Sequence, residues 1–370
     1  MRAFHKLTPE QIVLGKALPW DVFDSGGQLL LRKGNVVSDP AQASELAERG
    51  VYVDEVEYLA SLEGREPPYE PFHIVASVSA NLAYLLSHLP RDGSLQHEVE
   101  REAERLSWVA EHSPDATLAM IQLGEPDPYP ARHAVLAAIL ADMLAQSMGW
   151  DDDRRISTLC AAMTMNAGMH TLQHQLSRQR DSLNPEQQQI VDQHPAESAR
   201  LLIGCGVQDD EWLRAVLEHH ERPDGCGYPR KTRDMSEIAR LIHVCDVFTA
   251  MLSPRVYRPQ LSGNEAVRQI LSVYTEASGN PFGPLLTRLV SMYPPGTLVK
   301  LANGELAVVF KRGAHPFKPS VASLIDPKGM RNTKVPIRQT SEAEFAIAAV
   351  IAPGKAMIRI PLTQLWQHRP

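Results

Sequence analysis

The sequence lacks long apolar segments and the marks of export. Its longest apolar runs, such as Phe345 to Ala352, are far shorter than the ~18 residues that a membrane-spanning helix needs. The N-terminal segment MRAFHKLTPE has no apolar core of the kind that a secretory signal carries. Internal repeats, heptads and low-complexity tracts are also absent. We therefore expect a cytoplasmic protein without a membrane span.

Cysteine and positive charge are scarce as well. The four cysteines contain no CxxC pair, so free thiols in a reducing compartment are expected rather than a disulfide framework. Lys and Arg number 37 against 44 Asp and Glu, which gives a formal net charge of −7. This acidic balance argues against a protein that coats a nucleic acid polymer or an anionic membrane.

What the sequence does contain indicates several domains. A length of 370 residues with 44% hydrophobic residues is typical of a globular chain of two or three domains. We expect a small α/β module at residues 1–62, a helical connector at 63–124, a helical bundle at 125–290 and a β-rich module at 291–370. The predicted fold class is therefore multidomain and mainly α.

Local patterns place the elements of these domains. Strands on either side of Asp24–Gly27 predict a hairpin, and a capped helix is expected over residues 39–50. From about residue 130 apolar residues recur with period 3.6, and Asn184-Pro185 predicts a helix start. Pro195 predicts a helix boundary. Near the C-terminus the period becomes two, and Asn303-Gly304 predicts another hairpin.

Histidine is concentrated in the helical region, which holds seven of the 14 histidines between residues 133 and 243. A buried carboxylate needs a cation or hydrogen-bond donors, and imidazoles converging with a carboxylate inside a bundle can form a metal cage. The alternative is that each residue is a satisfied polar group of the core. The candidate metal ligands lie on the apolar faces or edges of the helical segments: His133, His194, His219, His220 and Asp246.

The segment from His219 to Pro229 reads HHERPDGCGYP. It resembles the HHExxDGxGYP signature of the HD-GYP family, bacterial phosphodiesterases that hydrolyse cyclic di-GMP, and it matches every defining position. His133, His194-Pro195 and Asp246 resemble other conserved positions of that family. The resemblance covers about residues 125–285. It implies that the bundle is an HD-GYP-like domain whose metal ions would be iron or manganese.

One segment departs from the family pattern. Where the family has LHDIGK, Met165 stands for the His, Asn166 for the Asp and Met169 for the Lys, while Gly168 is retained. In the family that carboxylate bridges two metal ions and holds the attacking hydroxide. A neutral amide contributes no charge, and one charge pair 4 Å apart is worth about 4 kcal/mol at an effective dielectric of ~20. A thioether is also a poor ligand for hard metals.

These losses predict a cofactor content of no metal or one divalent metal, iron or manganese by the resemblance, and leave the catalytic residues unassigned. His170 and His174 are possible replacement ligands, although a solvated position is the simpler interpretation of both. The resemblance also implies a surface that binds a cyclic dinucleotide or a diguanylate cyclase (GGDEF) domain. Its candidate residues are Asp224, Gly225, Gly227, Tyr228, Pro229, Arg255 and Arg258.

Two functions are therefore compared. The main hypothesis is a degenerate HD-GYP signalling protein of cyclic di-GMP pathways, catalytically impaired, that acts through a protein partner, a cyclic dinucleotide or both. The alternative is a metal-dependent cyclic di-GMP phosphodiesterase that retains residual hydrolysis to pGpG or GMP. The replacement of Met165, Asn166 and Met169 favours the first hypothesis.

Overall fold

A computed structural model describes the greater part of the chain. The described residues are 4–8, 11–24, 29–39, 46, 51–54, 57–58, 61, 70–89, 93–123, 129–253, 260–275, 278–352 and 365–366. The chain divides into two compact units, Met1–Glu70 and Pro71–Pro370. Helices dominate the second unit, and strands occur in both, so the predicted mainly α class with strand-rich ends is confirmed. The finer boundaries at residues 124 and 290 stay a prediction.

The N-terminal unit contains a four-stranded antiparallel sheet with the order β1-β4-β2-β3. Its strands are β1 (Phe4–Lys6), β2 (Val22–Phe23), β3 (Leu29–Leu31) and β4 (Tyr52–Asp54). The antiparallel pairing of β2 with β3 confirms the first predicted hairpin. Most of the helix predicted over residues 39–50 lies outside the described residues.

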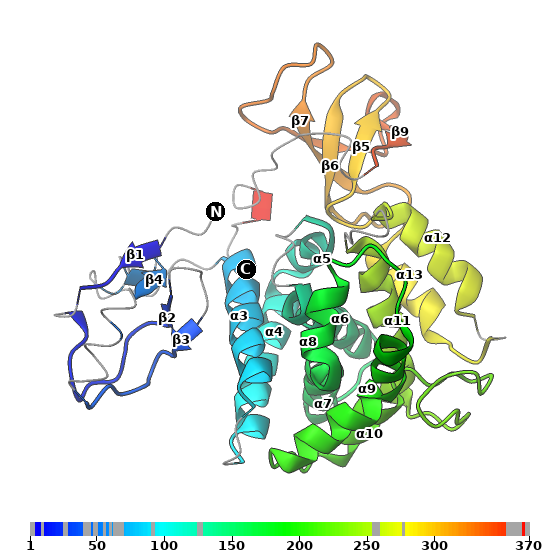
Figure 1. The fold of residues 1–370 in the computed structure, drawn as a ribbon. Helices are drawn as coiled ribbons and strands as arrows, with labels where there is room; N and C mark the ends of the chain where they lie inside the picture. Colours follow the sequence, from blue (N-terminus) through cyan, green and yellow to red (C-terminus); the bar gives the residue numbers. More distant parts are fainter. Residues whose placement is uncertain are drawn as a thin grey trace. The chain divides into compact units, whose positions relative to one another are not determined.

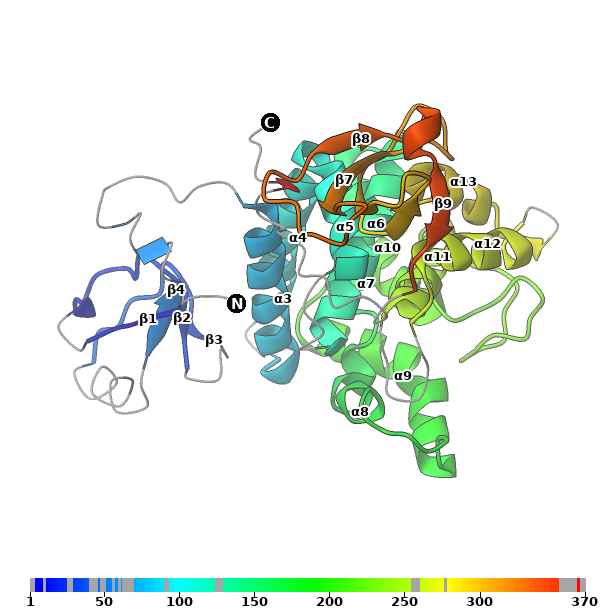
Figure 2. The same cartoon turned by 90° about the horizontal axis from the view of Figure 1, so that it is seen from above.

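The second unit is built around a helical bundle (Figures 1 and 2). Its α-helices are α3 (Pro71–Ser87), α4 (Leu95–His112), α5 (Pro114–Leu123), α6 (Tyr129–Ser147), α7 (Asp152–Thr164), α8 (His170–Leu176), α9 (Pro185–Gly204), α10 (Asp210–Glu218), α11 (Glu237–Leu252), α12 (Gly263–Val273) and α13 (Phe282–Val290). Helix α6 packs against α7 and α11 and is buried around most of its circumference. An apolar sequence such as VLAAIL is what such a central helix needs.

Helix α9 starts as predicted but does not end where predicted. Asn184 is its N-cap and forms a capping box with Gln187, which satisfies otherwise unpaired backbone donors. The expected boundary at Pro195 is wrong, because α9 runs through this residue to Gly204. A proline inside a helix removes one backbone hydrogen bond, and tertiary contacts hold the helix together across that gap.

A five-stranded antiparallel sheet with the order β8-β7-β6-β5-β9 follows the bundle. The strands are β5 (Leu298–Leu301), β6 (Leu306–Lys311), β7 (Ser320–Ile325), β8 (Ile337–Gln339) and β9 (Ile347–Val350). The β5–β6 hairpin turns at Asn303-Gly304, where Gly304 adopts φ +95°, so the second predicted hairpin is confirmed. Arg312 attaches the sheet to α5 through an ion pair of 2.7 Å with Asp115.

Two further expectations can be compared with the described residues. All four cysteines are free thiols, and Cys160, Cys205 and Cys245 are buried. Among the helices that the structure describes, none is long and apolar enough to cross a membrane.

A buried ion pair links α6 to α7. The guanidinium of Arg155 donates to both carboxylate oxygens of Asp142, at 2.8 and 3.2 Å, and the two side chains are 7% and 1% exposed. Arg155 also donates to Ser107 and Glu111 of α4. Burial raises the pKa of Asp142, and Arg155 opposes that rise. The arginine thus keeps a desolvated carboxylate charged at the junction of three helices.

We expect Arg155→Met to lower the free energy of unfolding by about 3–5 kcal/mol, because it leaves a buried carboxylate without its cation. The folded-state pKa of Asp142 would rise further above its unfolded value. The variant should therefore be most stable below the unfolded pKa and should lose stability as pH rises through the folded pKa. Urea unfolding at several pH values measures this. The double variant Asp142→Leu/Arg155→Met should recover most of the loss; equal instability of both variants would contradict the argument.

Candidate metal centre and ligand cavity

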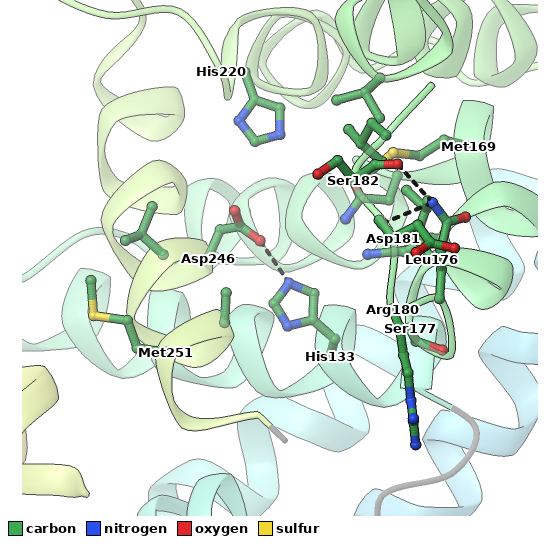
Figure 3. Close-up of a pocket in the computed structure, with 17 residues that line it drawn as sticks. His133, Met169, Leu176, Ser177, Arg180, Asp181, Ser182, His220, Asp246 and Met251 are labelled. Atoms are coloured by element: carbon green, nitrogen blue, oxygen red, sulfur yellow. Dashed lines mark hydrogen bonds and ion pairs between the residues drawn. The ribbon is translucent and has the colours of Figure 1, made fainter. Parts of the chain in front are cut away.

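Four helical segments bring the five candidate ligands together in the bundle. His133 comes from α6, His194 from α9, and His219 and His220 from the end of α10, while Asp246 lies on α11. His133, His194 and His219 are 3% exposed or less. His133, His220 and Asp246 line a common cavity, which Figure 3 shows. The chain therefore places all five sequence-predicted positions in the same region.

Three of these imidazoles form a cluster with metal-ligand spacing. One ring nitrogen from each of His194, His219 and His220 lies within 4.8 Å of the others. Neither His170 nor His174 belongs to this cluster, and both are half-buried at α8. The structure thus groups His194 with the adjacent His219 and His220. The possible replacement ligands, His170 and His174, lie outside this group.

Backbone carbonyls fix the tautomers of two of the clustered rings. Nδ1 of His194 donates to the carbonyl of Val191 at 2.6 Å, and Nδ1 of His219 donates to the carbonyl of Val216 at 2.7 Å. A carbonyl can only accept, so both Nδ1 atoms carry hydrogen. In the neutral rings the Nε2 atoms are then bare acceptors, and they face each other at 3.1 Å.

Two opposed lone pairs at this distance need a cation between them. A proton is disfavoured, because burial lowers the pKa of His194 to about 3 and that of His219 to about 4. Burial also takes the pKa of His220 well below its usual value. Neutral imidazole nitrogens are preferred ligands of divalent transition metals. The donor set of His194, His219 and His220 therefore fits one such ion.

His133 and Asp246 pair with each other. Nε2 of His133 lies 2.7 Å from Oδ1 of Asp246, whose side chain is 13% exposed. Burial raises the pKa of Asp246, but the hydrogen bond and charge of His133 outweigh this effect and hold it below its usual value. A buried carboxylate requires such a partner. Asp246 lies between His133 and His220 in the view of Figure 3.

The segment that departs from the family pattern lies beside the cluster. Met165 is fully buried in the main hydrophobic core, whereas Asn166 and Met169 line the cavity. Asn166 is 6% exposed, and its side-chain oxygen has no hydrogen-bond partner among the described residues. Gly168, in the short 3₁₀ helix η2 (Ala167–Met169), packs so tightly on α9 that an added Cβ would lie 2.8 Å from the carbonyl oxygen of His194.

The cavity has a volume of about 730 Å³, and α6, η2, α8, α9, α11 and the loop between α8 and α9 line it. Sequence reasoning missed two of its polar groups. Gln173 on α8 is 8% exposed and its side-chain oxygen has no hydrogen-bond partner in the described structure. Arg180 lies on the α8–α9 loop and makes no ion pair within the described residues. Neither belongs to a recognisable motif, so the sequence carried no signal that could have found them.

The loop of residues 224–229 (the GYP loop) contacts the histidine cluster through the ring of Tyr228. Gly225 adopts φ +76°, and a Cβ on Gly227 would lie 2.5 Å from the backbone of Glu221. The Tyr228 ring stacks on His220 with centroids 4.7 Å apart, and Pro229 follows it through a cis bond. Glu221, buried and not singled out from the sequence, accepts hydrogen bonds from the backbone of residues 230 and 232 and so fixes the loop.

The remaining predicted ligand or partner residues fall into two groups. Asp224 is at the exposed surface of the loop, where it pairs with Arg222 at 2.6 Å and accepts from the backbone of Cys226. Arg255 and Arg258 lie outside the described residues.

Comparisons with known proteins agree on the nature of the bundle. Residues 115–275 match the family model of the HD domain. The cyclic di-GMP phosphodiesterase PA4108 of Pseudomonas aeruginosa is 30% identical over 233 residues, which are 61% of this chain and 54% of that protein. A 3'3'-cGAMP-specific phosphodiesterase (number 3) of Vibrio cholerae is 27% identical over 142 residues, 38% of this chain and 31% of that protein. The chain spans about half the length, or less, of these curated relatives.

A solved structure shares the fold. Bd1817, an HDG"Y"P protein from Bdellovibrio bacteriovorus, superimposes with a TM-score of 0.52 at 17% sequence identity, over 78% of this chain and 98% of that one. The family match, the relatives and this structure lead to one conclusion. Residues 115–275 are an HD domain, and the relatives and this fold support the predicted resemblance to the HD-GYP family.

Proposed function

We propose that this domain binds a cyclic dinucleotide in the cavity beside a single divalent metal ion and acts as a catalytically impaired signalling protein. The observation that carries the proposal is the opposition of the His194 and His219 Nε2 atoms at 3.1 Å, with His220 completing the cluster. When bound, the ion would supply Lewis-acid polarisation of a phosphate oxygen. All other chemistry of the site comes from the side chains of the chain.

The cavity suits a cyclic dinucleotide in size and chemistry. About 730 Å³ lies within the range of small-molecule sites, which combine apolar walls with a few polar groups. Met169 and Met251 offer apolar surface for nucleobases, and Arg180 offers a cation for a phosphodiester. The guanidinium of Arg180 lies well away from His220 in Figure 3. Relatives named for cyclic di-GMP and for 3'3'-cGAMP support the same ligand class.

The impairment follows from charge. The family's bridging carboxylate is an amide at Asn166, and the one carboxylate among the five candidate ligands, Asp246, pairs with His133. A site with one carboxylate offsets less of the repulsion between two divalent cations than a site with two carboxylates does. Met169 also leaves the cavity without the family's lysine.

A second candidate function is hydrolysis of the cyclic dinucleotide with the metal held by the surviving histidines. The comparisons favour this candidate over loss of activity, because the named relatives are phosphodiesterases. The residue replacements favour binding without efficient turnover, so the two candidates differ in the rate of hydrolysis rather than in the ligand. Docking of a diguanylate cyclase (GGDEF) domain on the GYP loop stays a prediction.

The first prediction concerns the cluster. Wild-type protein titrated anaerobically with Mn²⁺ should bind one equivalent, and His219→Ala should lose this binding, because one of the two opposed Nε2 ligands is removed. Calorimetric titration measures both. His174→Ala is the matched control, since this histidine lies on α8 outside the cluster. Two bound equivalents in the wild type, or equal losses in both variants, would contradict the single-metal site.

The second prediction concerns Arg180. Arg180→Gln should weaken cyclic di-GMP binding about tenfold, because a charge-assisted hydrogen bond to phosphate is lost. Arg200→Gln should not change affinity, since Arg200 is exposed on α9 and paired with Glu197. Equilibrium dialysis with labelled nucleotide measures the difference. Binding by the wild type with no effect of Arg180→Gln would remove Arg180 from the site but keep the ligand.

The third prediction separates the two candidate functions. Wild type loaded with Fe²⁺ or Mn²⁺ should produce no measurable pGpG or GMP from cyclic di-GMP. Asn166→Asp/Met169→Lys, which changes only cavity-lining positions, should bind metal more tightly because a carboxylate is added beside the imidazoles. Wild-type turnover that His219→Ala abolishes would establish the hydrolytic candidate instead.

A further inference from the structure

Pro195 occupies an unusual place in α9. The helix extends from Pro185 to Gly204, so Pro195 is well inside it. In a helix the N–H of each residue donates to the carbonyl four residues earlier, which for position 195 is that of Val191. Proline has no N–H, so the Val191 carbonyl lacks its helical donor. A partly buried carbonyl in this situation is satisfied when a side chain donates to it.

His194 supplies that partner. Its Nδ1 donates to the Val191 carbonyl at 2.6 Å, from a ring that is 1% exposed. The donor comes from the residue immediately before the proline. The missing backbone hydrogen bond and the side-chain hydrogen bond therefore meet at one oxygen atom.

His219 has the same arrangement by a different route. Its Nδ1 also donates to the carbonyl three residues earlier, that of Val216. Helix α10 ends at Glu218, so Val216 is within the last turn, where carbonyls have no helical donor. The end of a helix frees the carbonyl for His219, and a proline frees the equivalent carbonyl for His194.

We propose that Pro195 is a positioning residue for His194. By removing one backbone N–H, it reserves the Val191 carbonyl for Nδ1 and thereby sets the tautomer that turns a bare Nε2 toward His219. Metal-ligand histidines generally depend on such a hydrogen bond from the other ring nitrogen. The consequence for metal affinity rests on the proposed single-metal site; the tautomer assignment does not.

The surroundings of α9 hold the backbone in place at this turn. Gly168 sits against the His194 carbonyl, and its N–H donates to Oγ of Ser198 at 2.8 Å. The same hydroxyl donates to the carbonyl of Met165 at 2.8 Å. These contacts fix the turn from His194 to Ser198 against η2. We therefore expect a substitution at position 195 to change the hydrogen bonds of this turn without moving its backbone.

The test is Pro195→Ala in the full chain. The new N–H competes for the Val191 carbonyl, and the helix gains a hydrogen bond. We expect the Tm of the metal-free protein to rise by roughly 5 °C, since an interior proline is costly. Mn²⁺ affinity should fall about 10–100-fold, the usual effect of losing such an orienting bond. A residue of purely structural importance would not change stability and affinity in opposite directions.

Nitrogen NMR of ¹⁵N-histidine in metal-free protein gives an independent readout. His194 should be the Nδ1–H tautomer in the wild type and should lose that preference in Pro195→Ala. Pro195→Gly introduces the same N–H without a Cβ and should show the same tautomer change without a large gain in Tm. Pro185→Ala, at the first position of α9, is the control and should change neither tautomer nor affinity.

The outcomes are distinct. An unchanged His194 tautomer in both Pro195 variants would overturn the proposal, whatever their stability. An altered tautomer with unchanged Mn²⁺ affinity would overturn its link to metal binding. Wild-type protein that binds no Mn²⁺ would refute the proposed metal site, while the NMR comparison would still decide the role of Pro195.

Discussion

The site depends on one constraint, which is that two buried imidazoles face each other through nitrogen lone pairs. The Nε2 atoms of His194 and His219 are 3.1 Å apart, and carbonyl hydrogen bonds at their Nδ1 atoms prevent either ring from turning its proton inward. Burial makes protonation unfavourable. The other features of the centre are arranged around this pair. The imidazole of His220 completes the cluster, the end of α10 leaves the Val216 carbonyl without a helical donor, and Pro195 does the same for the Val191 carbonyl.

Much of this centre could be predicted from the sequence because its parts are short and local. The HHERPDGCGYP segment identified the fold, and the 3.6-residue period placed His133 and Asp246 on faces that meet. The hairpin at Asn303-Gly304 was equally local, since a two-residue turn needs little more than its own sequence. What was correct, therefore, depended on short sequence motifs and on the periodicity of each segment.

The wrong prediction and the missed residues depend instead on contacts between elements that are distant in the sequence. Pro195 indicated a helix boundary by local preference, but packing of Gly168 and Ser198 across the turn keeps α9 continuous. Gln173 and Arg180 belong to no sequence motif. Gln173 lies on the seven-residue helix α8 and Arg180 on the loop after it, and only the fold shows that both line the cavity.

The burial of Met165 bears on how this domain could change over time. Its side chain is completely enclosed within the main core, where the thioether needs no hydrogen bond. A histidine at this position would bring a polar ring into that space, and without a metal to accept its lone pair it would cost stability. A change of Met165 to histidine alone would therefore lower the stability of the domain, unless a bound metal ion compensated the ring.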